Sequence, residues 1–420
     1  MKNNAIKYLF FLVLIGLVAC QEENYENPAK RRAKFFNDFQ ATLHSAEKGW
    51  IMHYFASPQS PGYNLFLDFL DNSQVIIGGQ TPYPSFEYKE FQSQYGLTIA
   101  NGPILNFITY NEILHSFADP DITRDSEGDF EFVIVDFTED WIQLRGKRTD
   151  AMIQMMKVPK DQSGKEYIIQ ADEMKSTLFH RQIPYLYLEV DEKLYRFAGG
   201  FSSVFQITEL NNDTVAVQVI PFVATLDGFR LYAPFNVNGK SVQEFRVNSD
   251  KTYLFAVEDS SIRMREMPFL SFFLDPSTWL SGVSWRLDDE NLGTNFAVAY
   301  QKVVEACKNV FNEEFNYFFF TFRPDRNSQT LSFLSGNRYS GTFDLEITLK
   351  ENTEEVIFVN KATMDRNGEI YLENISGFQE ILNLLFNSSF IVKTELPLCP
   401  TILKLTSVSD PKNCFQIKIE

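Results

Sequence analysis

Histidine, cysteine and tryptophan are scarce in this 420-residue chain, which has four of each. No histidine has a partner at metal-ligand spacing, and neither an H-E-x-x-H signature nor a C-x-x-C pair occurs. The G-x-S-x-G turn that presents the nucleophilic serine of α/β-hydrolases is also missing. The sequence therefore predicts no metal site and no cofactor, and it offers no standard catalytic motif.

Runs of lysine and arginine are missing as well. The chain has 38 Lys and Arg against 55 Asp and Glu, a formal net charge of −17. Nucleic-acid binding depends on cationic side chains that neutralise phosphates. We therefore exclude nucleic acid as a partner.

No apolar run is long enough to cross a bilayer as a helix, which takes about 20 residues. The N-terminus instead combines Lys2 and Lys7 with a short apolar stretch over residues 8–19, a pattern typical of a secretory signal peptide. Its end, Leu17-Val18-Ala19-Cys20, resembles the lipobox of bacterial lipoproteins. We expect residues 1–19 to be removed; the alternative is a plain signal peptide that ends in cysteine.

Cys20 is accordingly the predicted lipid anchor. Two or three acyl chains, at about 0.8 kcal/mol per buried CH₂, would hold the protein stably on a membrane. The acidic residues that follow, Gln21-Glu22-Glu23 and then Glu26, are similar to the export signal of Bacteroidota surface lipoproteins. We therefore expect an outer-membrane location facing the cell surface; the alternative is a solvated tether without a sorting role.

Phenylalanine and tyrosine are abundant, with 41 and 18 residues beside only 20 glycines, which favours β-structure. Residues 20–48 are predicted to form an acidic tether and an N-terminal helix. Residues 49–158 have several short strand patterns, of which Tyr63–Phe69 alternates most clearly. The predicted fold is mainly β: an antiparallel meander that forms a lipocalin-like barrel or a sandwich. A small barrel with an aromatic interior can enclose a ligand.

Two further regions are predicted after the charged segment Lys157–Lys165. Residues 166–280 form a second β-rich domain, and residues 281–420 an α+β C-terminal domain with one long helix near Leu292–Asn312. Asp288 or Asp289 is the expected cap of this helix. Asp365-Arg366-Asn367-Gly368 is the expected turn of a hairpin.

Five residues are candidates for ligand binding, each with a structural alternative. Asp129 and Glu131 lie on one face of a predicted strand, close enough for a carboxylate pair of the kind that glycosidases use. Asn111 lies near His115, and Trp50 is an aromatic platform if it is exposed. Packing and solvated charge are the competing explanations for all five. No catalytic residue is predicted.

Three cysteines remain after Cys20. Cys307 is on the apolar face of the long predicted helix, which favours a buried thiol. Cys399 and Cys414 would lie in an oxidising compartment. The sequence leaves open whether they form a disulfide.

Several segments together resemble a known family. They are Gly49-Trp50, His53-Tyr54, Gly62-Tyr63, Leu105–Asn111, Leu114-His115, Asp119-Pro120, Gly128–Val133, Leu144–Thr149, Asp227–Tyr232, Asp410-Pro411 and Phe415. Their order is similar to the Bacteroidota lipoprotein family known as domain of unknown function 4302; one departure is Arg145 and Arg148, where lysine is expected. The resemblance implies an envelope lipoprotein associated with nutrient uptake systems of the SusC/SusD type. It implies no activity and no catalytic residues.

These features lead to one favoured hypothesis and two alternatives. The favoured one is a non-enzymatic, surface-exposed outer-membrane lipoprotein that binds a ligand or partner, polysaccharide or peptide, in an uptake system. The first alternative is a hydrolase of glycan or peptide, which requires carboxylates, or His115 with a carboxylate and a nucleophile, at catalytic distances. The second is a structural accessory subunit, which requires a large apolar surface patch.

Overall fold

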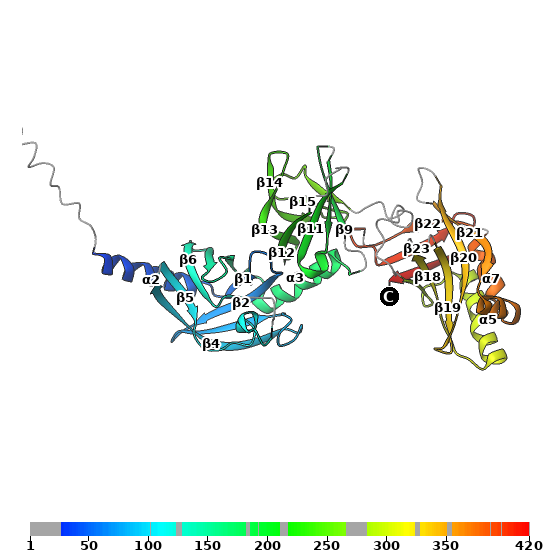
Figure 1. The fold of residues 1–420 in the computed structure, drawn as a ribbon, viewed down its shortest axis with the longest axis horizontal. Coiled ribbons are helices and arrows are strands. Elements are labelled where there is room, and N and C mark those ends of the chain that lie inside the picture. Colours follow the sequence, from blue (N-terminus) through cyan, green and yellow to red (C-terminus); the bar gives the residue numbers. More distant parts are fainter. Residues whose placement is uncertain are drawn as a thin grey trace, which may run out of the picture.

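The computed structural model describes residues 27–100, 102–122, 128–181, 185–191, 193–210, 217–265, 284–323, 328–350, 355–386, 388–395 and 397–419. Cys20 and the expected signal peptide therefore lie outside the described residues. Antiparallel strands dominate, and they close into three successive barrels of eight strands each in the described chain (Figure 1). The expectation of a mainly β fold is confirmed, and of the two alternatives for the N-terminal meander the structure has the barrel.

The first barrel follows helix α2 (Pro28–His44), and every strand in it pairs with its neighbour in sequence. Its strands are β1 (Trp50–Phe55), β2 (Gly62–Leu70), β3 (Gln74–Gly79), β4 (Lys89–Ala100), β5 (Gly102–Phe107), β6 (Glu131–Phe137), β7 (Trp141–Gly146) and β8 (Met152–Lys157), with the 3₁₀ turn η1 (His115–Ala118) before β6. The barrel closes where β1 pairs with β8. Closure gives every strand two neighbours and removes the sheet edges.

Alternation of side chains along each strand fills the interior of the first barrel. Tyr63, Leu65, Leu67 and Phe69 of β2 point inward, and α2 adds Phe39 and Leu43 to the same core. Because this core is filled by apolar side chains, the expected ligand-enclosing interior is wrong. The ligand pocket of this region lies outside the barrel, as described below.

Helix α3 (Gly164–Leu178) leads to the second barrel. The strands are β9 (Tyr185–Val190), β10 (Lys193–Ala198), β11 (Val204–Leu210), β12 (Val217–Thr225), β13 (Gly228–Val237), β14 (Lys240–Val247), β15 (Tyr253–Ala256) and β16 (Arg263–Arg265), with the 3₁₀ turn η2 (Gly200–Ser202) between β10 and β11. The sequence analysis predicted no helix here. A capping box nevertheless begins α3, since the Ser163 hydroxyl accepts from the Glu166 N–H and the Glu166 carboxylate accepts from the Ser163 N–H.

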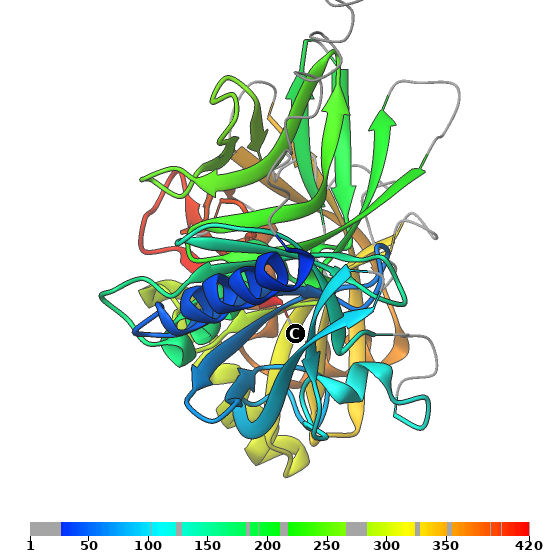
Figure 2. The same cartoon turned by 90° about the vertical axis from the view of Figure 1, so that its left-hand side faces the viewer.

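In the described residues the third barrel carries three helices on its outer side, among them the long helix that was predicted (Figures 1 and 2). Its strands are β17 (Ser284–Asp288), β18 (Phe315–Arg323), β19 (Ser328–Ser335), β20 (Tyr339–Leu349), β21 (Glu355–Met364), β22 (Ser389–Lys393), β23 (Ile402–Ser407) and β24 (Cys414–Ile419), and its helices are α5 (Thr294–Phe311), α6 (Arg366–Asn374) and α7 (Phe378–Phe386). The long helix is confirmed as α5, but Gly293 occupies its N-cap, not Asp288 or Asp289.

The expected hairpin turn at Asp365–Gly368 is wrong because Asp365 caps a helix there. Its carboxylate accepts a hydrogen bond of 2.7 Å from the Gly368 N–H, and α6 follows. An aspartate three residues before a free N–H suits a helix N-cap as well as a turn.

Cys399 and Cys414 do not form the disulfide that the sequence left open: both are free thiols, as is Cys307. Cys414 lies opposite Thr406 in the β23–β24 ladder, where its thiol faces Gly293. Cys399 is instead buried in the third core, and burial raises the pKa of its thiol to about 12. Its neighbour Leu398 belongs to the core of the second barrel, so this segment joins two cores.

The first and second barrels pack directly on each other through β2 and β12. Val223 of β12 belongs to the core of the first barrel, and Ala224 packs with Ile51 and α3. Gly62 permits this approach, because a Cβ there would collide with the Phe222 carbonyl oxygen and the Val223 side chain. The Asn64 side-chain amide adds a 2.8 Å hydrogen bond to the Ala224 carbonyl oxygen.

We predict that Gly62→Ala destabilises the protein by about 1–3 kcal/mol, because the added methyl group forces two close-packed backbones apart. Urea unfolding followed by tryptophan fluorescence measures the effect. The matched control is Gly96→Ala in β4, where the new methyl group would meet only the flexible side chain of Ile108 at 3.0 Å. Equal losses for the two variants would contradict a special role of Gly62 at the junction.

A candidate ligand-binding pocket between the first two barrels

Each of the five candidate residues from the sequence has a structural partner in the described structure, and none of them lines the pocket described below. Trp50 is fully buried, and its indole Nε1 donates a 2.8 Å hydrogen bond to the Leu43 carbonyl oxygen at the end of α2. It therefore joins the helix to the barrel core. The exposure on which a role as a binding platform depended is therefore not met, and the packing alternative holds.

Asn111 and His115 form one buried turn before η1. The Asn111 carboxamide oxygen accepts from the N–H groups of Ile113 and Leu114 at 3.0 and 3.2 Å, and the His115 Nδ1 accepts from the Asn111 N–H at 3.1 Å. The imidazole stacks on Phe130 with ring centroids 4.6 Å apart. Burial lowers the pKa of His115, and backbone hydrogen bonds partly oppose that shift. The hydrogen-bond and stacking partners of the imidazole in the described structure include neither a nucleophile nor a carboxylate. These contacts pack the ring as part of the turn.

Asp129 and Glu131 do not act as a pair. The buried Asp129 carboxylate accepts from the N–H groups of Arg148 and Thr149, both at 2.9 Å, and from the Thr149 hydroxyl at 2.7 Å. Glu131 forms a separate, solvent-exposed ion pair of 2.7 Å with Lys147. Asp129 thus fixes the β7–β8 turn, and the two carboxylates have separate partners, as the structural alternative expects.

Asp129→Asn is expected to lower the free energy of unfolding by about 2–3 kcal/mol, because an amide replaces a carboxylate that accepts three buried hydrogen bonds. The control is Glu131→Gln, where losing a surface ion pair costs less than about 1 kcal/mol. Both values come from urea titrations of the full chain. A larger loss for Glu131→Gln than for Asp129→Asn would contradict this account.

A pocket rich in polar side chains lies where the outer face of the first barrel meets the second. It has a volume of about 200 Å³. Its lining residues come from both barrels and are His53, Phe55, Gln143, Met152, Gln154, Val223, Arg230, Leu231, Tyr232 and Gln243. Clefts at domain interfaces with a few convergent polar groups are common ligand sites.

The first barrel contributes a polar row that runs across its strands. Gln143 of β7 lies opposite Gln154 of β8, Gln154 lies opposite His53 of β1, and His53 lies opposite Asn64 of β2. Because neighbouring strands are about 4.8 Å apart, the row spans roughly 14 Å. All four residues alternate with inward core residues, so they share the outer face that the second barrel covers.

His53 is the unusual member of this row. It is only 2% exposed, and its Nε2 has no hydrogen-bond partner within the described structure. Burial, and then the nearby positive charge of Arg230, lowers its pKa to about 3. An orphaned polar atom in a core costs stability and needs an explanation. A ligand bound in the pocket that His53 lines would give this nitrogen a partner.

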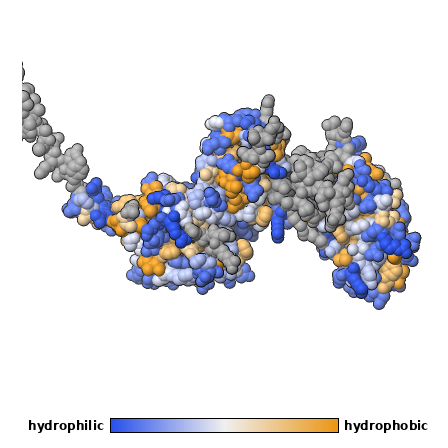
Figure 3. Space-filling view, in the orientation of Figure 1, coloured by the Kyte–Doolittle hydropathy of each residue, from blue (hydrophilic) through white to orange (hydrophobic). Residues whose placement is uncertain are grey.

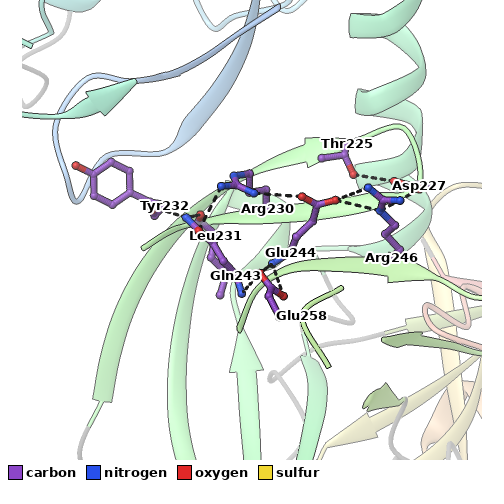
Figure 4. Close-up of polar contacts among 9 residues, drawn as sticks. All are labelled: Thr225, Asp227, Arg230, Leu231, Tyr232, Gln243, Glu244, Arg246 and Glu258. Carbon is purple, nitrogen blue, oxygen red and sulfur yellow. Dashed lines mark hydrogen bonds and ion pairs between the residues drawn. The ribbon is translucent and has the colours of Figure 1, made fainter. Parts of the chain in front are cut away.

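The second barrel contributes a bulged segment of β13. The β13–β14 register shifts between Arg230 and Phe235, and bulges commonly redirect side chains beside functional sites. Tyr232 extends from this segment away from the other side chains in Figure 4, and its hydroxyl accepts a 3.0 Å hydrogen bond from the Met152 N–H of the first barrel. The phenolic proton of Tyr232 stays available to donate to a bound group.

Gln243 and Glu244 hold the rest of the second wall in place. The Gln243 amide donates to the carbonyl oxygens of Leu231 and Tyr232 at 3.0 and 3.2 Å, and its oxygen accepts from Arg230 at 3.3 Å. Arg230 also forms a 3.2 Å ion pair with Glu244. These bonds satisfy the backbone groups that the bulge releases and fix the guanidinium beside the pocket.

The sequence analysis named none of these lining residues as a site. A signal was present, since His53 is the one polar residue in the otherwise apolar strand Trp50–Phe55. Arg230 and Tyr232 lie in the Asp227–Tyr232 segment that carries part of the family resemblance. Their convergence could not be read from the chain, because the walls come from strands far apart in sequence.

The fold and the pocket define a tandem-barrel protein with a preformed polar site at a barrel junction. Residues 22–249 match the family model described as Domain of unknown function (DUF4302), more than half of the chain, so the chain belongs to this family. The match spans both barrels that form the pocket, except for the last strands of the second. No curated protein matches the sequence.

Comparison with solved structures returns bacterial sliding clamps at low similarity. The DNA polymerase III beta chain of Streptococcus pneumoniae is 10% identical with a TM-score of 0.15, and the comparison covers 91% of this chain and 97% of that one. The DNA polymerase beta subunit of Streptococcus pyogenes is 12% identical with a TM-score of 0.13, at 91% and 97% coverage. A sliding clamp from Pseudomonas aeruginosa is 8% identical with a TM-score of 0.14, at 92% and 97% coverage. TM-scores this low carry no argument for this chain.

Metal-ligating side chains do not cluster in the described residues. No group of three or more His, Cys, Asp or Glu side chains among them is arranged so that it could hold a metal ion. In the same part of the chain, no helix has the length and apolar character that crossing a membrane requires.

We predict that His53→Leu leaves the protein as stable as the wild type at pH 7.5, or more stable by about 1 kcal/mol, because it removes an unsatisfied buried nitrogen. As the pH falls from about 6.5 towards 3, the unfolded histidine takes up a proton that the folded one refuses. Wild-type stability should therefore fall relative to the variant by up to about 1.4 kcal/mol per pH unit.

Urea unfolding of both proteins between pH 7.5 and pH 4.5 measures this difference. Because the two proteins share every other titrating group, the change in the gap between them isolates His53. A His53→Leu variant that is clearly less stable at pH 7.5 would show that the imidazole acts as ordinary core packing.

Proposed function

We propose that this protein is a surface-exposed outer-membrane lipoprotein that binds a polar ligand, polysaccharide or peptide, as a component of a nutrient uptake system. The observation that carries the proposal is the inter-barrel pocket, in which the unpartnered His53 nitrogen faces a wall built from Arg230, Tyr232 and Gln243. A folded protein keeps such a costly group where binding a ligand compensates for it.

The rigidity of the walls supports binding. Val223 is anchored in the first core, Asn64 is bonded to Ala224, and Tyr232 is bonded to Met152, so both walls are set before a ligand arrives. A preformed site loses little conformational entropy on binding. The polar groups that line the pocket are side-chain amides, an imidazole, a phenol and a guanidinium paired with a carboxylate. These groups can form hydrogen bonds to a ligand without catalysing a reaction on it.

The N-terminal sequence supports the proposed location. Cys20 follows a short apolar segment that resembles a lipobox, and acidic residues come next. An acylated Cys20 would anchor the protein with α2 and the first barrel following directly in the chain. The pocket would then be displayed on the same side of the membrane as ligands arriving from outside.

The mixed composition of the barrel surfaces supports the proposal that the protein is exposed to solvent. Figure 3 shows hydrophobic residues on the first two barrels interspersed with hydrophilic ones in that view. Exposed apolar side chains such as Val135 are ordinary on folded surfaces. This favours a binding component over a purely structural subunit that would need a continuous apolar patch.

Cys20→Ala is expected to move the protein from the membrane fraction to the soluble fraction, because the acyl chains have no other attachment point at the lipobox. Cell fractionation and protease treatment of intact cells measure anchoring and surface display. Cys414→Ala is the matched control and should stay with the membrane. Retention of Cys20→Ala on the membrane would contradict the anchor.

Capture from surface-labelled cells tests the role in uptake. The wild type should co-purify with an outer-membrane uptake protein, and Cys20→Ala should lose that association. Recovery of the wild type without any uptake protein would contradict the proposed complex.

A further inference from the structure

The second wall of the pocket carries two guanidinium groups and three carboxylates. Figure 4 shows the Glu244 carboxylate between Arg230 and Arg246, and Arg246 also approaches Asp227. The distances are 3.2 Å from Arg230 to Glu244, 2.7 Å from Arg246 to Glu244 and 3.5 Å from Arg246 to Asp227. Glu258 adds another carboxylate, which accepts from the N–H groups of Gln243 and Glu244 at 3.0 and 3.2 Å. Each guanidinium group of this wall is thus already paired with a carboxylate, so the wall does not attract an anionic ligand.

The first wall carries no formal charge at neutral pH. Its polar members are the amides of Gln143 and Gln154 and the imidazole of His53, whose depressed pKa keeps it neutral. The Gln143 amide donates a 2.9 Å hydrogen bond to the Ile153 carbonyl, which leaves its oxygen as the acceptor on offer. An amide, an imidazole and a phenol together provide both donors and acceptors. A ligand ring that bears several hydroxyl groups matches this set of donors and acceptors, because each hydroxyl group can both donate and accept a hydrogen bond.

Size and ring contacts narrow the ligand further. A volume of about 200 Å³ is below the roughly 300 Å³ at which sites for drug-sized ligands begin. The pocket therefore holds one ring or one side chain of a larger molecule. Phe55 and Tyr232, with ring centroids 4.8 Å apart, supply apolar surface for the C–H face of such a ring.

Peptide capture by strand addition has no template at this site. Strand addition needs an open sheet edge. Both barrels are closed in the described structure, and Gln243 already binds the carbonyl groups that the β13 bulge releases. The net charge of −17 further disfavours anionic ligands at long range.

We propose that the inter-barrel pocket binds a single uncharged sugar ring of a glycan and discriminates against sugars that carry a carboxylate. This inference rests on the proposed ligand-binding function and names its substrate class. The paired guanidinium of Arg230 contributes hydrogen bonds to hydroxyl groups, and Glu244 prevents it from selecting an anion.

The test compares matched sugars by saturation-transfer NMR on the full mature chain in detergent. The probes are D-glucose, D-galactose and D-mannose, each paired with its uronic acid. At least one neutral sugar should bind about tenfold more tightly than its uronate, because the uronate would place a carboxylate beside Glu244. His53→Leu should abolish binding of the neutral sugar.

A charge variant separates the cause of selectivity from the integrity of the fold. Glu244→Gln leaves Arg230 without its carboxylate, so the uronate should gain affinity and the preference should shrink or reverse. Glu209→Gln is the control, because it breaks an exposed 2.9 Å ion pair with Lys193 elsewhere on the second barrel. It should leave the preference unchanged, and a urea titration of each variant confirms folding.

The outcomes distinguish this inference from the proposed function. Uronates that bind as tightly as neutral sugars would overturn the inference and leave ligand binding intact. Binding of trialanine in place of any sugar, lost in His53→Leu, would do the same. Absence of every sugar signal would overturn the inference, and sugar binding that His53→Leu leaves unaffected would overturn both the inference and the pocket as the site.

Discussion

The close approach of β2 to β12 is the contact on which the candidate site depends. A glycine at position 62 lets the two backbones meet, Val223 crosses into the core of the first barrel, and Asn64 bonds to the Ala224 carbonyl. Helix α3 packs against both barrels beside this contact. The hydrogen bonds from the Asn64 amide to the Ala224 carbonyl and from the Met152 N–H to the Tyr232 hydroxyl add to this packing, and together they fix one barrel relative to the other. The pocket is a consequence of that fixed junction.

The polar row on the first barrel shows how stability and function compete at the junction. An interface of this kind would be most stable if residues 53, 143 and 154 were apolar, because burial of apolar surface is favourable and buried polar groups cost free energy. The hydrogen bond from the Asn64 amide to the Ala224 carbonyl offsets part of that cost, although Asn64 Oδ1 lacks a partner in the described structure. His53 Nε2 also lacks a partner there, so no hydrogen bond of this nitrogen offsets the cost of burying it. Both residues therefore make this row less stable than apolar residues would.

Much of the fold could be predicted from local patterns, because alternation in strands and the 3.6-residue period in helices are local. The inward face of Tyr63–Phe69 and the long helix α5 are examples. Helix α3 was missed since its mixed polar surface hid the period, although Ser163 and Glu166 form a readable capping box. The site was not predictable, because its walls come from residues 53–55, 143–154 and 223–243, whose meeting depends on barrel closure and on barrel packing. Asp129 illustrates the opposite error: a carboxylate that looked available is committed to the turn at Arg148 and Thr149.

The pocket lies entirely within the part of the chain that the family model matches. All of its lining residues lie inside residues 22–249, whereas the third barrel begins at Ser284. The third barrel has its own core, yet Leu398 returns from it into the core of the second barrel while Cys399 stays in the third. The family model therefore covers every strand that lines the pocket, and the third barrel lies outside it. Among the described residues, the segment at Leu398 and Cys399 links the second core to the third, so a ligand bound between the first two barrels would act on the third barrel through that segment.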